Sequence, residues 1–373
     1  MTAVLLAATP ATAQTQPVRG STTPSALPVT LTAVSCTSPQ ICVAVGGQGV
    51  TVPLASIAAR TSDGGEEWAS TLFGAASAQP SALACPTSHL CVAVGGRIVG
   101  TTDTGAAITS EDGGRSWTVI SKMPKGVGQL ASISCPVKGF CMAVGSTVDR
   151  LSGVALVSTR FGSRWKLVPL PVGEKSLALV TCSTQEHCIV VGGGSSGASA
   201  TILTTSNAGR SWTTASVPPV TSEGFPGAGG ISCPGASECF IVGDSIVPDG
   251  GPSGYIWTSV DGGAHWTSET LPSDTNFLTA VSCVTAAQCV AVGGGVLPRG
   301  GVVRSILITS NGGQTWVSQV VPTLAAGLSG VSCSTAEECM AVGGGFATTS
   351  PSAPLAPVVL VTHDGGVTWV AEP

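Results

Sequence analysis

The stretch LTAVSCVTAAQCVAVGGG at residues 278–295, followed by SILITSNGGQTWV at 305–317, is one copy of a repeat that occurs seven times. Each copy places two cysteines six positions apart, continues with a run such as Cys-Val-Ala-Val-Gly, and ends on a tryptophan. The cysteine pairs are Cys36/Cys42, Cys85/Cys91, Cys135/Cys141, Cys182/Cys188, Cys233/Cys239, Cys283/Cys289 and Cys333/Cys339. The closing tryptophans are Trp68, Trp117, Trp165, Trp212, Trp266, Trp316 and Trp369.

Each copy divides into four β-strands. In the sixth copy we expect strands at 278–283, 289–293, 305–309 and 315–320, with a hairpin turn of the Asn-Gly type between the last two. Several short strands repeated about every 50 residues are typical of propeller blades. The sequence therefore predicts an all-β chain: a single seven-bladed β-propeller over 31–373, with four antiparallel strands per blade. Each blade can be built from contiguous sequence, so we expect no strand exchange between the termini, and a monomer.

The cysteines predict one disulfide per blade. All 14 fall into pairs of one fixed spacing, which favours disulfides in an oxidising compartment. We expect each pair to flank the turn between the first two strands, with the second cysteine beginning the second strand. Metal binding is the alternative, but each copy offers only two thiols, and nearby histidines, His89 and His187, occur in two copies.

Composition excludes several classes of function. Charged residues make up 9%, the net charge is −5, and no basic run resembles a nucleic-acid surface. No apolar run approaches the roughly 18 residues of a membrane span. We expect no cofactor and no metal.

The N-terminus resembles an incomplete signal peptide. Val4–Ala8 is a short apolar core, and Ala11-Thr12-Ala13 fits a small-residue cleavage pattern, but no positively charged segment precedes them. A disordered Ala/Thr tail is the alternative. Residues 14–30 are rich in Pro, Ser and Thr and are expected to be a linker. Together with the cysteines, this pattern predicts a secreted or cell-envelope protein.

The turn before each tryptophan fits [S/T]-x-D-x-G-x-x-W. Its polar position holds Asp63, Asp112, Asn207, Asp261, Asn311 and Asp364, while Arg160 replaces it in the third copy. We expect the Asp or Asn to accept hydrogen bonds from its own turn. This turn is the Asp-box, and the chain resembles the Asp-box, or BNR-like, β-propeller superfamily. Its members include sialidases, sortilin-type receptors, xyloglucan-degrading glycosidases and photosystem II assembly factors, and the resemblance implies a structural role for the box.

The parts of a sialidase site are missing. The resemblance implies three arginines and a Tyr/Glu pair, but the chain has one tyrosine, Tyr255, and its only arginine near the N-terminus is Arg19. We therefore expect a non-catalytic binding or scaffold propeller for a protein or cell-envelope ligand, the partner being a protein or a glycan. The alternative is a glycan-active enzyme with a degenerate or unrecognised site.

A binding site is expected on the loops between second and third strands, because these vary between copies. The candidate ligand-binding residues are Arg97, Asp149, Arg150, Asp244, Asp249 and Arg299, with Asp103 and Arg304 on the same loops. Asp244 stands where other copies carry Gly or Ser. Trp257 aligns with Leu203, Leu307 and Leu360 and is expected in the core rather than at a sugar.

Overall fold

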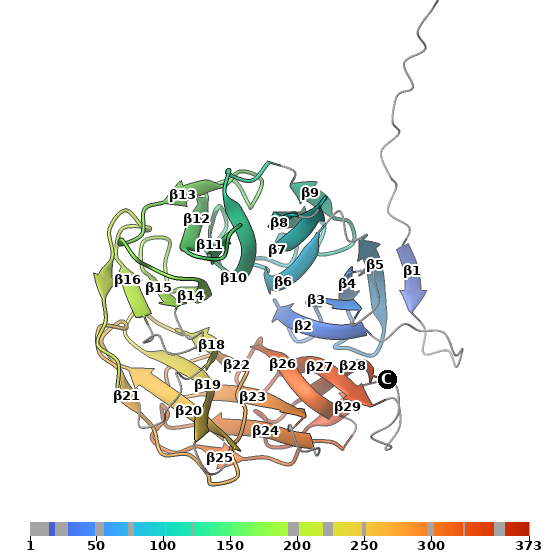
Figure 1. Ribbon diagram of the computed structural model, residues 1–373. Helices are drawn as coiled ribbons and strands as arrows, with labels where there is room; N and C mark the ends of the chain where they lie inside the picture. The colour runs from blue at the N-terminus through green and yellow to red at the C-terminus, as the bar shows by residue number, and fades with distance from the viewer. Residues whose placement is uncertain are drawn as a thin grey trace, which may run out of the picture.

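The structure is a computed structural model that describes residues 15–18, 29–48, 56–73, 78–100, 102–120, 122–192, 201–218, 227–247, 251–296, 302–323, 325–346 and 355–372. It is a ring of seven antiparallel sheets (Figure 1). The predicted seven-bladed propeller with four strands per blade is confirmed.

Each blade uses four consecutive strands, numbered from the inside of the ring outward (Figure 1). Blades 1 to 3 comprise β2 (Val29–Cys36), β3 (Cys42–Gln48), β4 (Ser56–Thr61) and β5 (Trp68–Phe73); β6 (Gln79–Ala84), β7 (Cys91–Val99), β8 (Thr102–Ser110) and β9 (Thr118–Ile120); β10 (Val127–Val137), β11 (Phe140–Thr147), β12 (Gly153–Ser158) and β13 (Lys166–Val168). Blades 4 and 5 comprise β14 (Leu177–Cys182), β15 (Cys188–Gly192), β16 (Thr201–Thr205) and β17 (Thr213–Thr214); β18 (Gly227–Ser232), β19 (Cys239–Val247), β20 (Gly251–Ser259) and β21 (Thr267–Ser268). Blades 6 and 7 comprise β22 (Ala280–Cys283), β23 (Cys289–Val296), β24 (Val302–Thr309) and β25 (Val317–Ser318); β26 (Ala325–Cys333), β27 (Cys339–Phe346), β28 (Leu355–Thr362) and β29 (Val370–Glu372).

The outer strands are shorter than the sequence predicts. In blade 6 the fourth strand was expected over 315–320, but β25 covers only Val317–Ser318. Trp316 lies before the strand and turns its ring inward, where it packs edge-on against Phe240 of blade 5 at a centroid distance of 6.3 Å. The tryptophan therefore belongs to the contact between blades rather than to the sheet.

Among the residues that the structure describes, the termini do not exchange strands, as predicted. Blade 7 is built from β26 to β29 alone, and it closes the ring against blade 1 through a shared apolar cluster that includes Met340, Val342, Leu31 and Ala44. One strand was not expected: β1 (Thr15–Val18), within the predicted linker, pairs antiparallel with β5 and becomes a fifth strand on blade 1.

All seven predicted disulfides are present, each between a cysteine and its partner six residues on, with Cα atoms 3.9–4.2 Å apart. In blade 1, Cys36 and Cys42 stand directly opposite each other in the ladder of β2 and β3. The same opposition occurs for Cys182/Cys188, Cys283/Cys289 and Cys333/Cys339. The bridge thus joins facing positions at the end of the innermost hairpin, as expected.

Blade 3 departs from the position that the sequence predicts for its second cysteine. The repeat places Cys141 at the start of the second strand, but β11 begins at Phe140, so Cys141 lies inside the strand, where it is buried. The first strand likewise runs past Cys135 to Val137, which pairs with Phe140. Gly139, with a φ of 103°, permits this tighter turn. The Cys135–Cys141 bridge is retained, but it crosses the ladder one step before the turn instead of flanking it.

A glycine within the second strand recurs for a steric reason. A Cβ on Gly95 would lie 1.9 Å from the carbonyl oxygen of Gln79, and one on Gly343 would lie 2.1 Å from that of Gly327. In both blades the register of the inner strand shifts beside this point, which brings its backbone over the neighbouring strand. Only glycine leaves room for that approach.

We expect Gly343→Ala to lower the free energy of unfolding by about 2 kcal/mol or more, because the added Cβ collides with backbone that cannot move aside cheaply. Gly295→Ala is the matched control: its Cβ would meet only the Phe277 ring, at 3.7 Å. Chemical denaturation of the two variants measures the difference, and equal stabilities would contradict the steric account.

Replacing both Cys85 and Cys91 by serine removes one bridge around a short loop. The chain-entropy estimate for such a loop is a loss of about 2 kcal/mol in unfolding free energy, with the ring still folded. Thermal denaturation checks the loss. Non-reducing peptide mapping of the unmodified protein is the control, and free thiols or bridges between blades in that map would show that the pairing is wrong.

Candidate functional site

The Asp-box turns form a closed set of hydrogen bonds. In blade 2, the Ser110 hydroxyl accepts from the Gly114 N–H at 2.7 Å and donates to Asp112 Oδ1 at 2.8 Å, and this oxygen accepts the Ser116 N–H at 2.9 Å. Asn207 makes the equivalent bonds in blade 4 through its amide oxygen. The polar side chains of these turns face their own backbone, which is the expected structural arrangement.

The cysteine turns and the Asp-box turns lie on one side of the ring, which we call the turn face. In six blades an amide of the Asp-box turn donates to a carbonyl of the cysteine turn, as Gly113 does to His89 at 2.8 Å. The loops between second and third strands leave the opposite ends of the same strands. We call that side the variable-loop face, and it is where the sequence places the candidate ligand-binding residues.

On the variable-loop face, blades 2 and 3 are joined by an ion pair. Arg150, in the β11–β12 turn, lies 3.1 Å from the Asp103 carboxylate near the start of β8. Asp103 in turn covers Gly96, where a Cβ would lie 2.6 Å from its Oδ1. Arg150 adopts a φ of 60°, an uncommon left-handed conformation for a residue other than glycine.

Asp149 serves its own turn. Its Oδ1 accepts hydrogen bonds from the Thr147 hydroxyl and from the Leu151 N–H, the latter at 3.0 Å. The Thr147 hydrogen bond, more than any other contact, lowers the pKa of this exposed carboxyl. The structure therefore gives Asp149 a role in shaping the loop, which the sequence did not indicate.

Apolar side chains flank the ion pair on both blades. Ile98 and Val99, at the end of β7, are 45% and 53% exposed, and Leu151, beside Arg150, is 74% exposed. Val148 is exposed on the same turn. Exposed aliphatic groups thus lie beside both partners of the ion pair.

A second group lies in blade 5. Asp244 is half-buried within β19, three residues before the strand ends, and burial raises the pKa of its carboxyl. Tyr255 on β20 packs against Trp257 with ring centroids 4.9 Å apart, and its hydroxyl lies 3.4 Å from the Gly227 carbonyl oxygen. Burial and the nearby Asp244 charge raise the pKa of Tyr255, so this phenol stays protonated.

The structure places the remaining candidate residues in different ways. Arg304 is structural: its guanidinium donates to the carbonyls of Ala325 and Thr323, which ties blade 6 to blade 7. Arg97 lies on β7 opposite Thr104, whose hydroxyl bonds to its carbonyl. Asp249 and Arg299 fall outside the described residues. The convergence of Asp149, Arg150, Asp244 and Arg299 therefore stays a prediction. Trp257 is 4% exposed, as expected for a core residue.

Sequence reasoning missed a Ser–His pair. In the cysteine turn of blade 4, the Ser183 hydroxyl lies 3.0 Å from His187 Nδ1. The other ring nitrogen faces the Asp-box turn of blade 5, where a Cβ on Gly262 would lie 3.2 Å from it. The four-residue separation of Ser183 and His187 was visible in the sequence, but it does not recur in the other copies and so gave no signal.

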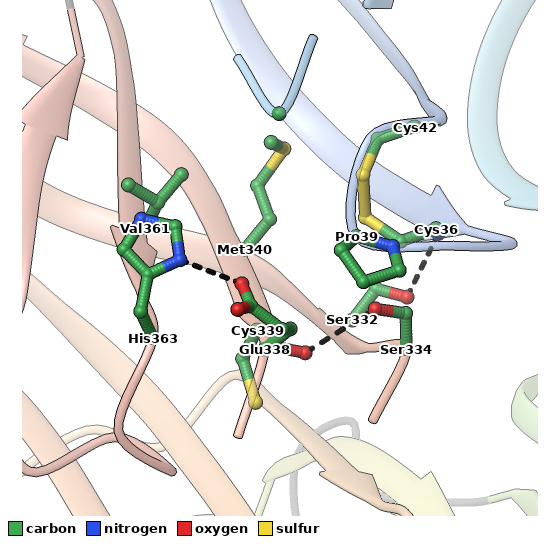
Figure 2. A pocket seen from close by; sticks show the side chains of 11 residues that line it. Cys36, Pro39, Cys42, Ser332, Ser334, Glu338, Cys339, Met340, Val361 and His363 are labelled. Carbon is green, nitrogen blue, oxygen red and sulfur yellow. Dashed lines mark hydrogen bonds and ion pairs between the residues drawn. A yellow bond between two sulfur atoms is a disulfide. The ribbon is translucent and has the colours of Figure 1, made fainter. Parts of the chain in front are cut away.

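The seam between blades 7 and 1 leaves a pocket of about 10 Å³ on the turn face, room for roughly one water. Figure 2 shows one hydrogen bond that crosses the seam, from Cys36 of blade 1 to Ser332 of blade 7, and one contact within blade 7, between His363 and Glu338. The Cys36 N–H donates to the Ser332 hydroxyl at 2.9 Å, and His363 Nδ1 lies 2.7 Å from Glu338 Oε2. The pocket is too small to hold a ligand.

Within the described residues, no cluster of His, Cys, Asp or Glu has the arrangement of a metal site. In the same residues no helix has the length and apolar character needed to cross a membrane.

No protein-family description matches the chain, and no curated protein matches it by sequence. Solved structures match it in fold. YCF48 bound to a D1 peptide has a TM-score of 0.53 and 17% identity, covering 80% of this chain and 82% of that one. YCF48 from Cyanidioschyzon merolae has a TM-score of 0.53 and 16% identity over 80% and 86%. A PL25 ulvan lyase bound to a glucuronate–rhamnose sulfate oligosaccharide has a TM-score of 0.58 and 11% identity over 91% and 95%.

These likenesses show the fold alone, because all the identities are below one fifth. They confirm the predicted resemblance to this class of propeller at the level of the repeat and the ring. The neighbours include both a peptide-bound protein and a polysaccharide lyase.

One prediction concerns the Asp-box of blade 5. Hydrogen bonds from the His265 N–H and ring lower the pKa of Asp261 from 3.8 to about 2. The ionised carboxylate is therefore favoured in the folded state. Its contribution to stability is complete above the unfolded pKa and is lost as pH falls from about 4 to about 2.

Asp261→Asn should fold, because asparagine fills this position in blades 4 and 6, and it should remove that titration. We expect a smaller drop in unfolding free energy for the variant than for the unmodified chain between about pH 5 and about pH 2. Urea denaturation at both pH values tests this, and identical drops would show that the carboxylate does not stabilise the turn.

Proposed function

We propose that this chain is a secreted, non-catalytic propeller that binds a protein ligand of the cell envelope on its variable-loop face. The observation that carries the proposal is the junction of blades 2 and 3. There the Asp103–Arg150 pair links two loop tips, and Ile98, Val99 and Leu151 expose aliphatic surface beside it. The seven bridges suit an oxidising compartment and support secretion.

The peptide bound to YCF48 supports a protein ligand, because a ring of similar architecture there presents a peptide-binding surface. Aliphatic side chains beside one charge pair match the contact surface of a protein better than that of a sugar, which is usually bound against exposed aromatic rings. The aromatic residues of blade 5, Tyr255 and Trp257, pack inward instead.

A glycan-active enzyme is the second candidate, and Asp244 is the observation that favours it. A half-buried carboxyl with a raised pKa, beside a tyrosine on the loop-bearing side of the ring, is the kind of group that general acid catalysis uses. The oligosaccharide bound to the ulvan lyase supports a similar use of this architecture.

The proposal predicts that the Val99→Ser, Leu151→Ser double variant loses its ligand. The matched control is Val260→Ser, Val367→Ser, because these valines are 79% and 53% exposed on the turn face. Each protein is used to capture partners from cell-envelope extract after crosslinking, with quantitative mass spectrometry as readout. A partner reduced about tenfold or more by the first pair and retained by the second supports the proposal. Loss with the control pair alone would move the site to the turn face.

The enzyme alternative has its own test. The purified protein is assayed on a glycan array and on a panel of fluorogenic glycosides and uronate polysaccharides. Turnover that disappears in Asp244→Asn, with an unchanged melting temperature, would overturn the non-catalytic proposal. Turnover unaffected by that change but lost in Ser183→Ala would place an enzyme site on the turn face.

A further inference from the structure

More than half of the basic residues of this chain, eight of 15, lie in one segment. All five lysines lie between residues 122 and 175, together with Arg150, Arg160 and Arg164. This segment holds eight basic residues against two acidic ones, a net charge of +6. The remainder of the chain holds seven basic against eighteen acidic residues, a net charge of −11. Blade 3, with the links on either side of it, is therefore a basic sector in an acidic ring.

These cations are exposed and, Arg150 excepted, form no ion pair with any residue the structure describes. The stretch 122–192 is described without a gap, and its acidic residues, Asp149, Glu174 and Glu186, form no ion pair with these cations. Unpaired like charges repel one another, and their concentration in one place is unfavourable for the isolated ring. A binding partner of opposite charge would remove that repulsion.

Blade 3 also departs from the other six where the cations sit. Arg160 replaces the Asp or Asn of the box, so its turn keeps the Ser158–Gly162 bond but loses the carboxylate. The tightened cysteine turn carries Lys138 at its tip, 5.8 Å from the centre of the Phe161 ring. Arg160 replaces a hydrogen-bond acceptor, and Lys138 stands where the other copies carry an uncharged residue, so both departures add a cation.

A groove at the outer edge of this blade collects three of the charges. It has a volume of about 500 Å³ and lies between the β9–β10 link and the start of β13. Its lining includes Lys122, Met123, Pro124, Arg164, Lys166 and Leu167. No acidic residue lines it among the residues the structure describes, and Leu167 is 49% exposed. Cations beside apolar side chains are complementary to a ligand that carries both carboxylates and apolar groups.

We propose that this groove binds an acidic polypeptide segment with interspersed aliphatic residues. An acidic glycan fits less well, because Trp165, the aromatic residue of the lining, is 5% exposed and offers no ring face to a sugar. Clusters of basic side chains recognise acidic peptide motifs through charge-assisted hydrogen bonds. The groove contains none of the residues on which the proposed function rests, so the two proposals can be tested independently.

The test measures binding of a fluorescein-labelled peptide of alternating Glu and Leu to the full chain by anisotropy. The same peptide with Lys in place of Glu is the charge control. We expect binding that weakens with salt, and about a tenfold loss of affinity in Arg164→Gln, Lys166→Gln. The matched protein control is Arg115→Gln, Arg210→Gln, which removes two exposed cations from the turns of blades 2 and 4 and should change affinity less than about twofold.

Three results would overturn the proposal: no binding of the acidic peptide, equal losses in the two double variants, or heparin binding that is tighter than peptide binding and lost in the same variant. Melting temperatures of both variants exclude misfolding as the cause of a loss. Sedimentation of the unmodified chain at low salt gives the fourth decisive result. A salt-sensitive dimer abolished by Arg164→Gln, Lys166→Gln would also overturn the proposal, because the partner would then be the acidic surface of a second copy and not a peptide segment.

Discussion

Burial of apolar surface between neighbouring blades is the interaction on which this structure depends. Each of the seven apolar clusters draws its residues from two adjacent blades. A single four-stranded blade with outer strands of two or three residues cannot bury enough surface to be stable alone. Met340 and Val342 of blade 7 cluster with Leu31 and Ala44 of blade 1. The first and last blades thus share the same kind of apolar interface as every other pair of neighbouring blades. Closure of the ring is thus a condition for folding as well as its result.

The contact between neighbouring blades explains why certain residues recur in every copy of the repeat. The closing tryptophan packs its ring at the junction with the preceding blade, as Trp316 does against Phe240. The serine before the first cysteine accepts a hydrogen bond from the first cysteine N–H of the next blade in five of the seven junctions. The disulfide and the Asp-box then fix the two turns that hold these groups in place. A residue type that recurs seven times is therefore a requirement of assembly and carries little information about ligands.

The same distinction explains what the sequence could predict. The ring, the four strands per blade and the disulfides follow from spacings that repeat, and all are present. The strand β1 could not be predicted, because Thr15–Val18 has no repeat to compare with and gains its ladder only from β5. The position of Cys141 within β11 could not be predicted, because the tighter cysteine turn occurs in blade 3 and is not part of the repeated pattern. Contacts of the candidate site also resist prediction: Asp103 and Arg150 are 47 residues apart and meet only because two blades are neighbours.

The outer edges of the blades have a consequence for solubility. An outer strand has one unpaired edge, and a long flat edge is a template on which another chain can polymerise as cross-β aggregate. In blades 2 to 7 the outer strand is only two or three residues long, too short for stable extension. Blade 1 alone has a six-residue outer strand, β5, and this is the edge that β1 covers. Removing β1 would therefore leave the fold's seams untouched while opening the one edge long enough to seed fibrils at high concentration.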